Sequence, residues 1–234
     1  GNGAPGYGTG APPSPSAGIG VGASTLYGTI GIFEAIASAD QIVGGDVTSF
    51  SNRGPGVANS VGADVVATGS FGTGSVSLNQ VLDGSIATDN FGGTSMAGPV
   101  AAGNLALIYD AFYQANGRWP FFFEAKEILM NSATNINDDV WSQGAGLVNA
   151  DSGTDIAAGL GGFYVSPSQW RAGDYRGEEY AGFSHIIQPG ASDTQEFTIA
   201  NTSDKLIVVR IQSNTLVQIG ADDYSFTSAD QSLE

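Results

Sequence analysis

Residues 100–112 (VAAGNLALIYDAF) constrain the fold of this chain more than any other segment. On a helical projection the apolar side chains of this segment lie on almost every side of the helix. Asp110 is the only charged residue in the segment. A helix without a polar face is stable only when neighbouring elements cover it on every side. The segment therefore predicts a helix at the centre of a sizeable domain, and 234 residues are enough chain for such a core.

Short apolar runs on both sides of this segment predict an α/β domain. Residues 19–24 (IGVGAS) indicate a buried strand, and residues 64–67 (DVVA), which are β-branched and bounded by turn residues, are typical of a parallel strand. Residues 123–133 (FEAKEILMNSA) begin just after Pro120 and predict a second helix. Residues 144–150 (GAGLVNA) then predict a tight return of the chain to the core.

The character of the sequence changes after about residue 161. Phe197 and Ile199 share one face of the run QEFTIA, as in a half-buried strand. Residues 201–204 (NTSD) predict a hairpin connection between the strands that flank them. We therefore expect one unit at 1–160 and a β-rich, sandwich-like and incomplete unit at 161–234. The β-rich runs of this second unit are 163–165, 195–200, 206–212 and 215–219.

Charge and composition exclude several classes of function. The chain has 7 Lys and Arg against 23 Asp and Glu, so its net charge is −16. No basic surface is available for nucleic acid, and an anionic membrane would repel the chain. The lack of Cys excludes disulfides, thiolate metal sites and a cysteine nucleophile. The longest apolar stretch, 99–109, is shorter than the roughly 18–20 residues of a membrane span.

Ser95 is the residue for which the sequence suggests chemistry. Gly92 and Gly93 allow a sharp turn before it, and the long apolar helix follows. Free N–H groups and the helix dipole favour negative charge there, which suits a serine nucleophile. From the residues alone, Thr94 and Ser95 could instead only cap the helix. Residues 1–18, almost all Gly, Pro, Ser and Ala, are equally open between a linker and an ordered binding loop.

Four motifs resemble, in the same order, those of subtilisin-like serine peptidases, the subtilases. Residues 93–99 (GTSMAGP) resemble the nucleophile motif Gly-Thr-Ser-Met-Ala-x-Pro. Residues 49–55 (SFSNRGP), with the strand at 64–67, resemble the turn Phe-Ser-x-Arg-Gly-Pro and its following strand. Residues 1–9 (GNGAPGYGT) resemble the Gly-Asn-x-Gly oxyanion loop, and 144–150 resemble the closing segment. The resemblance implies the C-terminal half of a subtilisin-like parallel sheet with flanking helices.

The resemblance also implies roles for single residues in peptide-bond hydrolysis. Ser95 would be the nucleophile that forms an acyl intermediate, and its backbone N–H would be one oxyanion donor. Asn2 would supply a second donor through its side-chain amide, with Gly1 and Gly3 beside it in the substrate-binding loop. Gly10 would lie at the base of the pocket for the side chain before the cleaved bond, where Gly leaves room for a large apolar group.

The Asp and His motifs of the family are not in this chain. The family order, Asp then His then Ser, puts both ahead of the oxyanion loop. His185, the only histidine, follows Ser95 by 90 positions, and we expect an ordinary surface or interface residue. The resemblance thus implies polypeptide substrates and, as a partner, the N-terminal portion of the same catalytic domain, without which this chain should be nearly inactive. The alternative is an inactive homologue that serves as a binding or scaffold module.

The resemblance further bears on ions and location. It implies a secreted protein, extracellular or at the cell surface, whose acidity has two interpretations: a solvated surface or adaptation to high salt, since the chain has only two lysines. No cofactor is required. Subtilases often bind structural Ca²⁺, although solvation is the simpler role for acidic residues that lack the spacing of an EF-hand. The candidate acidic residues are Asp138, Asp139, Asp151 and Asp155.

Overall fold

The structure is a computed structural model in which ten stretches of the chain are described. They are residues 1–11, 17–25, 45–56, 61–70, 72–75, 77, 87–174, 186–211, 213–218 and 226–231. The described elements, in chain order, are β1 (Val21–Ser24), β2 (Val65–Thr68), β3 (Gly72–Ser75), β4 (Thr88–Phe91), α2 (Thr94–Asn116), α3 (Phe122–Asn131), α4 (Val140–Gln143), α5 (Ala150–Ala158), β5 (Phe163–Ser166), β6 (Thr198–Asn201), β7 (Ser213–Gln218) and β8 (Phe226–Gln231).

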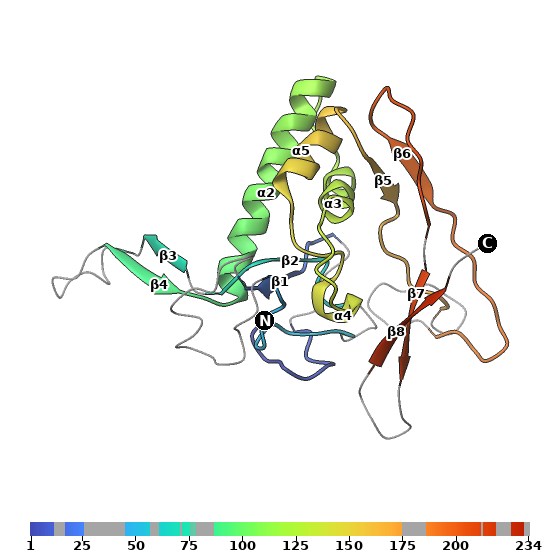
Figure 1. The fold of residues 1–234 in the computed structure, drawn as a ribbon, viewed down its shortest axis with the longest axis horizontal. Coiled ribbons are helices and arrows are strands. Elements are labelled where there is room, and N and C mark those ends of the chain that lie inside the picture. The colour runs from blue at the N-terminus through green and yellow to red at the C-terminus, as the bar shows by residue number, and fades with distance from the viewer. Residues whose placement is uncertain are drawn as a thin grey trace.

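Two short parallel strands lie at the foot of the long helix α2 (Figure 1). β1 pairs with β2 in parallel, from Val21 opposite Val65 to Ser24 opposite Thr68. A single parallel bridge joins Val66 to Leu147, so the segment predicted as a return to the core lies against the other edge of β2. Both predicted strands are confirmed, and with the helices they make an α/β fold.

Helix α2 begins earlier than the apolar pattern suggested. It runs for 23 residues and contains Pro99 in its second turn. Because proline has no N–H, the carbonyl of Ser95 loses its usual partner four residues on. The Ala residues of α2 meet those of the strands: Ala23, Ala67, Ala97 and Ala101 form one buried cluster. These small side chains let the start of α2 lie close to β1 and β2.

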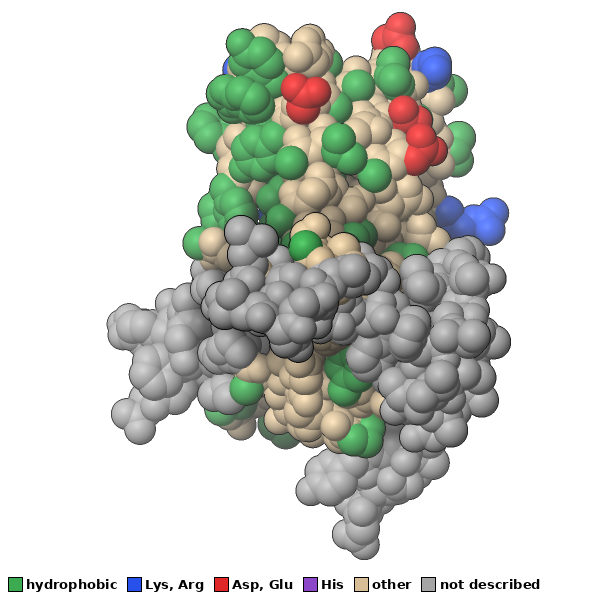
Figure 2. Space-filling view, turned by 90° about the vertical axis from the view of Figure 1, so that its left-hand side faces the viewer, with side chains coloured by type: hydrophobic (Ala, Val, Ile, Leu, Met, Phe, Trp, Pro, Cys, Tyr) green, Lys and Arg blue, Asp and Glu red, His purple; other side chains and the backbone are tan. Residues whose placement is uncertain are grey.

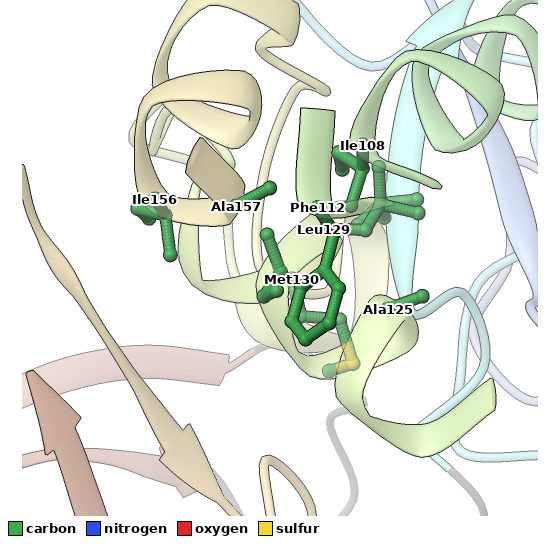
Figure 3. Packing of buried hydrophobic residues seen from close by; sticks show 9 residues of the cluster. Ile108, Phe112, Ala125, Leu129, Met130, Ile156 and Ala157 are labelled. Atoms are coloured by element: carbon green, nitrogen blue, oxygen red, sulfur yellow. The ribbon is translucent and has the colours of Figure 1, made fainter. Parts of the chain in front are cut away.

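The main core lies between α2, α3 and α5. Its largest members are Ile108 and Phe112 from α2, Ile128 and Leu129 from α3, and Ile156 from α5 (Figure 3). The helix predicted at 123–133 is confirmed as α3. Helix α5 was not predicted, because its sequence, ADSGTDIAA, has few apolar residues. It nevertheless packs along α2 and covers Ile108 with Gly153.

One side of α2 is not covered by the described residues. The buried residues of α2 are Ala97, Ala101, Ile108 and Phe112, whereas Leu107 is 51% exposed. Figure 2 shows hydrophobic side chains gathered on the upper part of the face that includes this side of the helix. Burial on every side, as predicted from residues 100–112, is therefore wrong for the part of the chain described here.

The remaining strands form antiparallel pairs: β3 with β4, β5 with β6, and β7 with β8. The β3–β4 ribbon extends away from the foot of α2 (Figure 1). The hairpin predicted around 201–204 is wrong, because β6 pairs with β5 and residues 206–211 form no strand. Leu206 and Val208 are more than nine-tenths exposed. The division of the chain near residue 160 stays a prediction.

The helices that the structure describes were also compared with the length and hydropathy of a membrane-spanning helix. None of them is both long and apolar enough to cross a bilayer.

A buried ion pair ties several of these elements together. Lys126 of α3 lies 3.1 Å from Asp64, and both side chains are less than a tenth exposed. The ammonium also donates to the carbonyl of Gly18 at 2.9 Å, and Asp64 accepts from the backbone N–H of Gly20 at 2.6 Å and from the amide of Gln169. The pair therefore joins α3, the chain before β1, the start of β2 and the segment after β5.

Replacing Lys126 should destabilise the fold, because Asp64 would be left buried without its cation. We expect Lys126→Met to lower the free energy of unfolding by about 3–5 kcal/mol, as for other broken buried pairs. Urea unfolding would measure the change. The matched control is Lys205→Met, since Lys205 is exposed and its ammonium donates to the carbonyl of Leu160 at 3.2 Å. Equal, small effects for both variants would contradict a structural role for the pair.

Glu127 should make the folded state less stable as pH rises, whereas a carboxylate in an ion pair makes it more stable. Burial, which is the main cause, raises the pKa of Glu127, while a hydrogen bond from Ser166 (3.0 Å) offsets part of that rise. The folded state then holds a proton more tightly than the unfolded chain, so stability falls as pH rises from the ordinary Glu pKa through the raised one.

Glu127→Gln should remove this fall and raise stability at pH 7, because the amide is neutral and can still accept from Ser166. Glu124→Gln is the control with the opposite sign: a hydrogen bond from Arg118 is the main cause that lowers the pKa of Glu124, so its charge favours the folded state. Urea unfolding between pH 4 and 8 tests both. A Glu127→Gln variant that is less stable than wild type at pH 7 would contradict the expected sign.

Candidate active site

Ser95 lies on the first turn of α2 and is exposed. The turn before it needs glycine, because Gly93 precedes the helix with φ of +111°. Gly93 stands at the N-cap position of α2 and has no side chain that could accept from the first N–H groups. The alternative in which Thr94 and Ser95 cap their own helix is therefore not what the structure shows.

The first N–H of α2 is instead satisfied by a residue 92 positions away. The side-chain oxygen of Asn2 accepts from the backbone N–H of Thr94 at 2.9 Å and from the Thr94 hydroxyl at 2.8 Å. These two bonds fix which way the amide is turned, so its Nδ2 group points away from the Thr94 N–H. Asn2, from the start of the chain, is thereby brought to the residue that precedes Ser95.

Two glycines permit this close approach. A Cβ on Gly93 would lie 3.0 Å from Nδ2 of Asn2, and the N–H of Gly93 donates to the carbonyl of Gly69 at 2.6 Å. A Cβ on Gly69 would lie 2.7 Å from the carbonyl of Gly93 and 2.6 Å from the Cβ of Ala23. Side chains at either position would push the start of α2 away from the strands.

This arrangement suits the stabilisation of an oxyanion. The N–H groups of the first helical turn lack partners within the helix, and the helix dipole favours negative charge at this end. The Thr94 N–H is bonded to Asn2 and the Met96 N–H to the carbonyl of Gly93, so among the described residues none accepts from the N–H of Ser95. A side-chain amide and a backbone N–H at the helix end that carries an exposed serine are donor types that can stabilise the oxyanion of acyl transfer.

The loop that carries Asn2 is held by the turn at 50–54. Ala4 N–H donates to the carbonyl of Phe50 (3.3 Å), and Gly8 and Thr9 N–H groups donate to the carbonyls of Gly54 and Arg53 (3.0 Å each). Residues 1–11 are thus an ordered loop, and the linker interpretation is wrong for them. Residues 12–16 lie outside the described part.

Tyr7 adds a contact from this loop to a distant helix end. Its hydroxyl donates to Asp139 at 2.6 Å, and its ring meets that of Trp141 edge-on at 5.9 Å between centroids. Asp139 also caps α4 by accepting from the N–H groups of Trp141 and Ser142. Burial and this hydrogen bond raise the pKa of Tyr7, so the phenol remains a donor at neutral pH.

The other candidate residues are placed as follows. A Cβ on Gly10 would lie 3.2 Å from the Cα of Gly56, so Gly10 packs against the chain just after the 50–54 turn. Its role in a substrate pocket stays a prediction. Gly1 and Gly3 lie on either side of Asn2 and contact the side chain of Asn52. His185 lies outside the described residues.

The candidate calcium ligands were Asp138, Asp139, Asp151 and Asp155. Within the described residues, no group of three or more His, Cys, Asp or Glu side chains could hold a metal ion. Asp139 is occupied by its bonds to Tyr7 and the start of α4. Burial raises the pKa of Asp138, and Asp151 lies in the first turn of α5 with Asp155 later in that helix. Structural Ca²⁺ stays a prediction.

Asn52 and Thr94 contact Asn2 or its neighbours, and sequence reasoning assigned neither of them to the site. The turn at 49–55 was identified, but Asn52 stood at its variable position. Turn-forming Asn is common for local reasons, so nothing in the sequence marked this one as a long-range contact.

Comparisons with known proteins agree with the motifs. The sequence profile of the subtilase family, Peptidase_S8, matches residues 1–148. No curated protein sequence matches the chain.

Solved structures with similar folds include three proteases. A lanthipeptide protease is 20% identical, with 48% of this chain and 38% of that protein covered at a TM-score of 0.39. The self-cleaved protease domain of PatA is 20% identical, with 65% and 49% covered at 0.45. The epidermin leader peptide processing serine protease from Staphylococcus aureus is 21% identical, with 63% and 32% covered at 0.40. The chain thus spans less than half the length of these structures.

The profile match covers 148 of the 234 residues and includes Asn2, Asn52, Ser95 and the segment that closes on β2. The chain therefore belongs to the subtilase family.

Proposed function

We propose that this chain carries the nucleophile and the oxyanion hole of a serine endopeptidase that hydrolyses peptide bonds through an acyl-serine intermediate. The observation that carries the proposal is the pair of hydrogen bonds from Thr94 to the side-chain oxygen of Asn2. They bring an amide from the first loop to the start of α2, where Ser95 is exposed. A serine that only formed part of the first helical turn would not need such a neighbour.

The chemistry assigns one task to each group. The Ser95 hydroxyl attacks the carbonyl carbon of the substrate, a C–O bond forms, and the carbonyl oxygen becomes an oxyanion. The Ser95 N–H and Asn2 Nδ2 donate to that oxygen. The C–N bond then breaks, the amine leaves with a proton, and water hydrolyses the ester. Fixed donors are effective here because they need no reorganisation as charge develops.

The proton of Ser95 requires a base, which we propose comes from the part of the catalytic domain that carries the family's Asp and His motifs. The described residues leave one side of α2 exposed, including Leu107, on a helix whose sequence calls for cover on every side. That side supports docking of the remaining part of the domain. Without a base, only the small residual rate enhancement from oxyanion donors and binding is expected.

The proposal also covers the location of the protein, its substrate class and its use of cofactors. A secreted peptidase, extracellular or at the cell surface, is consistent with a net charge of −16, which keeps a protein soluble. Polypeptides are the proposed substrates, and no cofactor takes part in the proposed chemistry.

Ser95→Ala should abolish labelling of the full-length protein by a fluorophosphonate probe, because the probe phosphorylates only an activated serine hydroxyl. Ser203→Ala, in the β-rich part, is the matched control and should label like wild type. Gel fluorescence measures the result. If wild type is not labelled although it is folded, the chain belongs to an inactive homologue, and a binding or scaffold role replaces the enzyme.

Asn2→Ala should lower kcat much more than it changes KM, because the amide donates mainly to the transition state. In subtilisin, loss of a side-chain oxyanion donor lowers kcat about 10²–10³-fold, and we expect the same range here. Asn116→Ala, at the far end of α2, is the matched control. Steady-state hydrolysis of a chromogenic peptide measures both. A change in kcat below about threefold would remove Asn2 from the oxyanion hole.

A further inference from the structure

Asn52 makes three hydrogen bonds to the loop that carries Asn2. Its backbone N–H donates to the carbonyl of Gly1 at 2.9 Å, and its Nδ2 donates to the carbonyl of Ala11 at 2.9 Å. Its Oδ1 accepts from the N–H of Gly3. The single residue Asn52 thus bonds both sides of Asn2 and the far end of the same loop.

We propose that Asn52 is a positioning residue for the oxyanion hole: its side chain holds residues 1–11 so that the Asn2 amide stays beside Ser95. This inference rests on the proposed function. Asn52 itself is assigned no contact with substrate. It acts through Gly1 and Gly3, the two neighbours of Asn2.

The glycines at positions 1 and 3 fit this role. A Cβ on Gly1 would overlap the Asn52 amide, and a Cβ on Gly3 would lie 3.0 Å from its Oδ1. Both glycines therefore leave the room that the Asn52 side chain occupies. Because glycine has no side chain and the widest range of backbone conformations, these residues also make the loop intrinsically flexible. A clamp from outside the loop is needed to fix Asn2.

Asn52 can serve as a clamp because its own position is fixed on both sides. Ser51 is fully buried, and its hydroxyl accepts from the N–H of Ala23 in β1 at 2.9 Å. On the other side, the N–H of Gly54 donates to the carbonyl of Trp141 at 2.8 Å. The side chain of Asn52 therefore extends toward the loop from a rigid part of the fold.

Losing the Asn52 side chain should loosen the loop without unfolding the domain. The Gly3 N–H and the Ala11 carbonyl would lose their partners, but the backbone bond to Gly1 and the bonds of Gly8 and Thr9 would remain. A displacement of about 1 Å in a reacting group can cost about 10²-fold in rate. We therefore expect Asn52→Ala to lower kcat by about 10- to 100-fold, with KM changed less than threefold.

The decisive test is a double-mutant cycle in the full-length protein with a chromogenic peptide substrate. If Asn52 acts through Asn2, Asn52→Ala should lower kcat in the wild-type background but by less than about threefold in the Asn2→Ala background. The matched control, Asn116→Ala, removes an amide that donates to the Phe112 carbonyl at 2.9 Å at the other end of α2, and should leave kcat unchanged. Equal losses in both backgrounds, or no loss in either, would overturn the inference.

A second measurement does not depend on activity. Amide hydrogen exchange should become faster at Gly3 and at Thr94 in Asn52→Ala, because Thr94 donates to the Asn2 oxygen that the loop positions. Asn116→Ala should leave both amides as protected as in wild type. If Asn52→Ala does not fold, Asn52→Ser removes the same two side-chain bonds and is measured instead. Unchanged exchange at Thr94 would overturn the inference.

The outcomes separate this inference from the proposed function. Loss of fluorophosphonate labelling in Ser95→Ala tests the nucleophile by itself. If wild type is labelled and Asn52→Ala behaves as wild type in both kcat and exchange, the enzyme stands and the role of Asn52 fails. If wild type is not labelled, the proposed function fails, and faster exchange at Thr94 in Asn52→Ala still shows that Asn52 holds the loop.

Discussion

The hydrogen bond from the Thr94 N–H to the side chain of Asn2 is the contact on which the site depends. A helix N-terminus needs acceptors for its first N–H groups, and a Ser, Thr, Asp or Asn just before the helix usually supplies one. Gly93 stands there and offers no side chain. The acceptor comes from the first loop instead, so the bond that satisfies the helix end also brings the Asn2 side chain to the start of α2, the turn on which Ser95 lies.

Small residues make that contact sterically possible. The carbonyl of Gly69 accepts from Gly93 at 2.6 Å, and Ala23 and Ala97 pack beside them, so backbone meets backbone between the strands and the start of α2. Larger side chains would bury more apolar area but would separate the helix from β1 and β2. The 35 glycines of the chain reflect, at these positions, a requirement for close approach rather than for flexibility.

Local patterns predicted several elements, β1, β2 and α3 among them, whereas long-range pairing was beyond them. Residues 19–24 and 64–67 have buried-strand composition, and both form strands because burial and β-branching act locally. The alternation of Phe197 and Ile199 predicted a strand but could not predict its partner. The predicted hairpin with 206–212 is wrong, because β6 pairs with β5 instead. Motif resemblance selected Asn2 and Ser95 as candidate site residues. Asn52 is one Asn in a turn, and its three bonds depend on how residues 1 and 52 meet in space.

Preorganisation explains why so much of the structure converges on one short loop. Glycines at positions 1, 3, 6, 8 and 10 give it many conformations when it is free, and ordering a residue costs roughly 1–2 kcal/mol in backbone entropy. The oxyanion role proposed for Asn2 requires that this cost is met before the substrate arrives, because reorganisation during the reaction would raise the barrier. The bonds from the 50–54 turn, which includes Asn52, and from Asp139 meet this requirement, since they originate in two places and act on both ends and the middle of the loop.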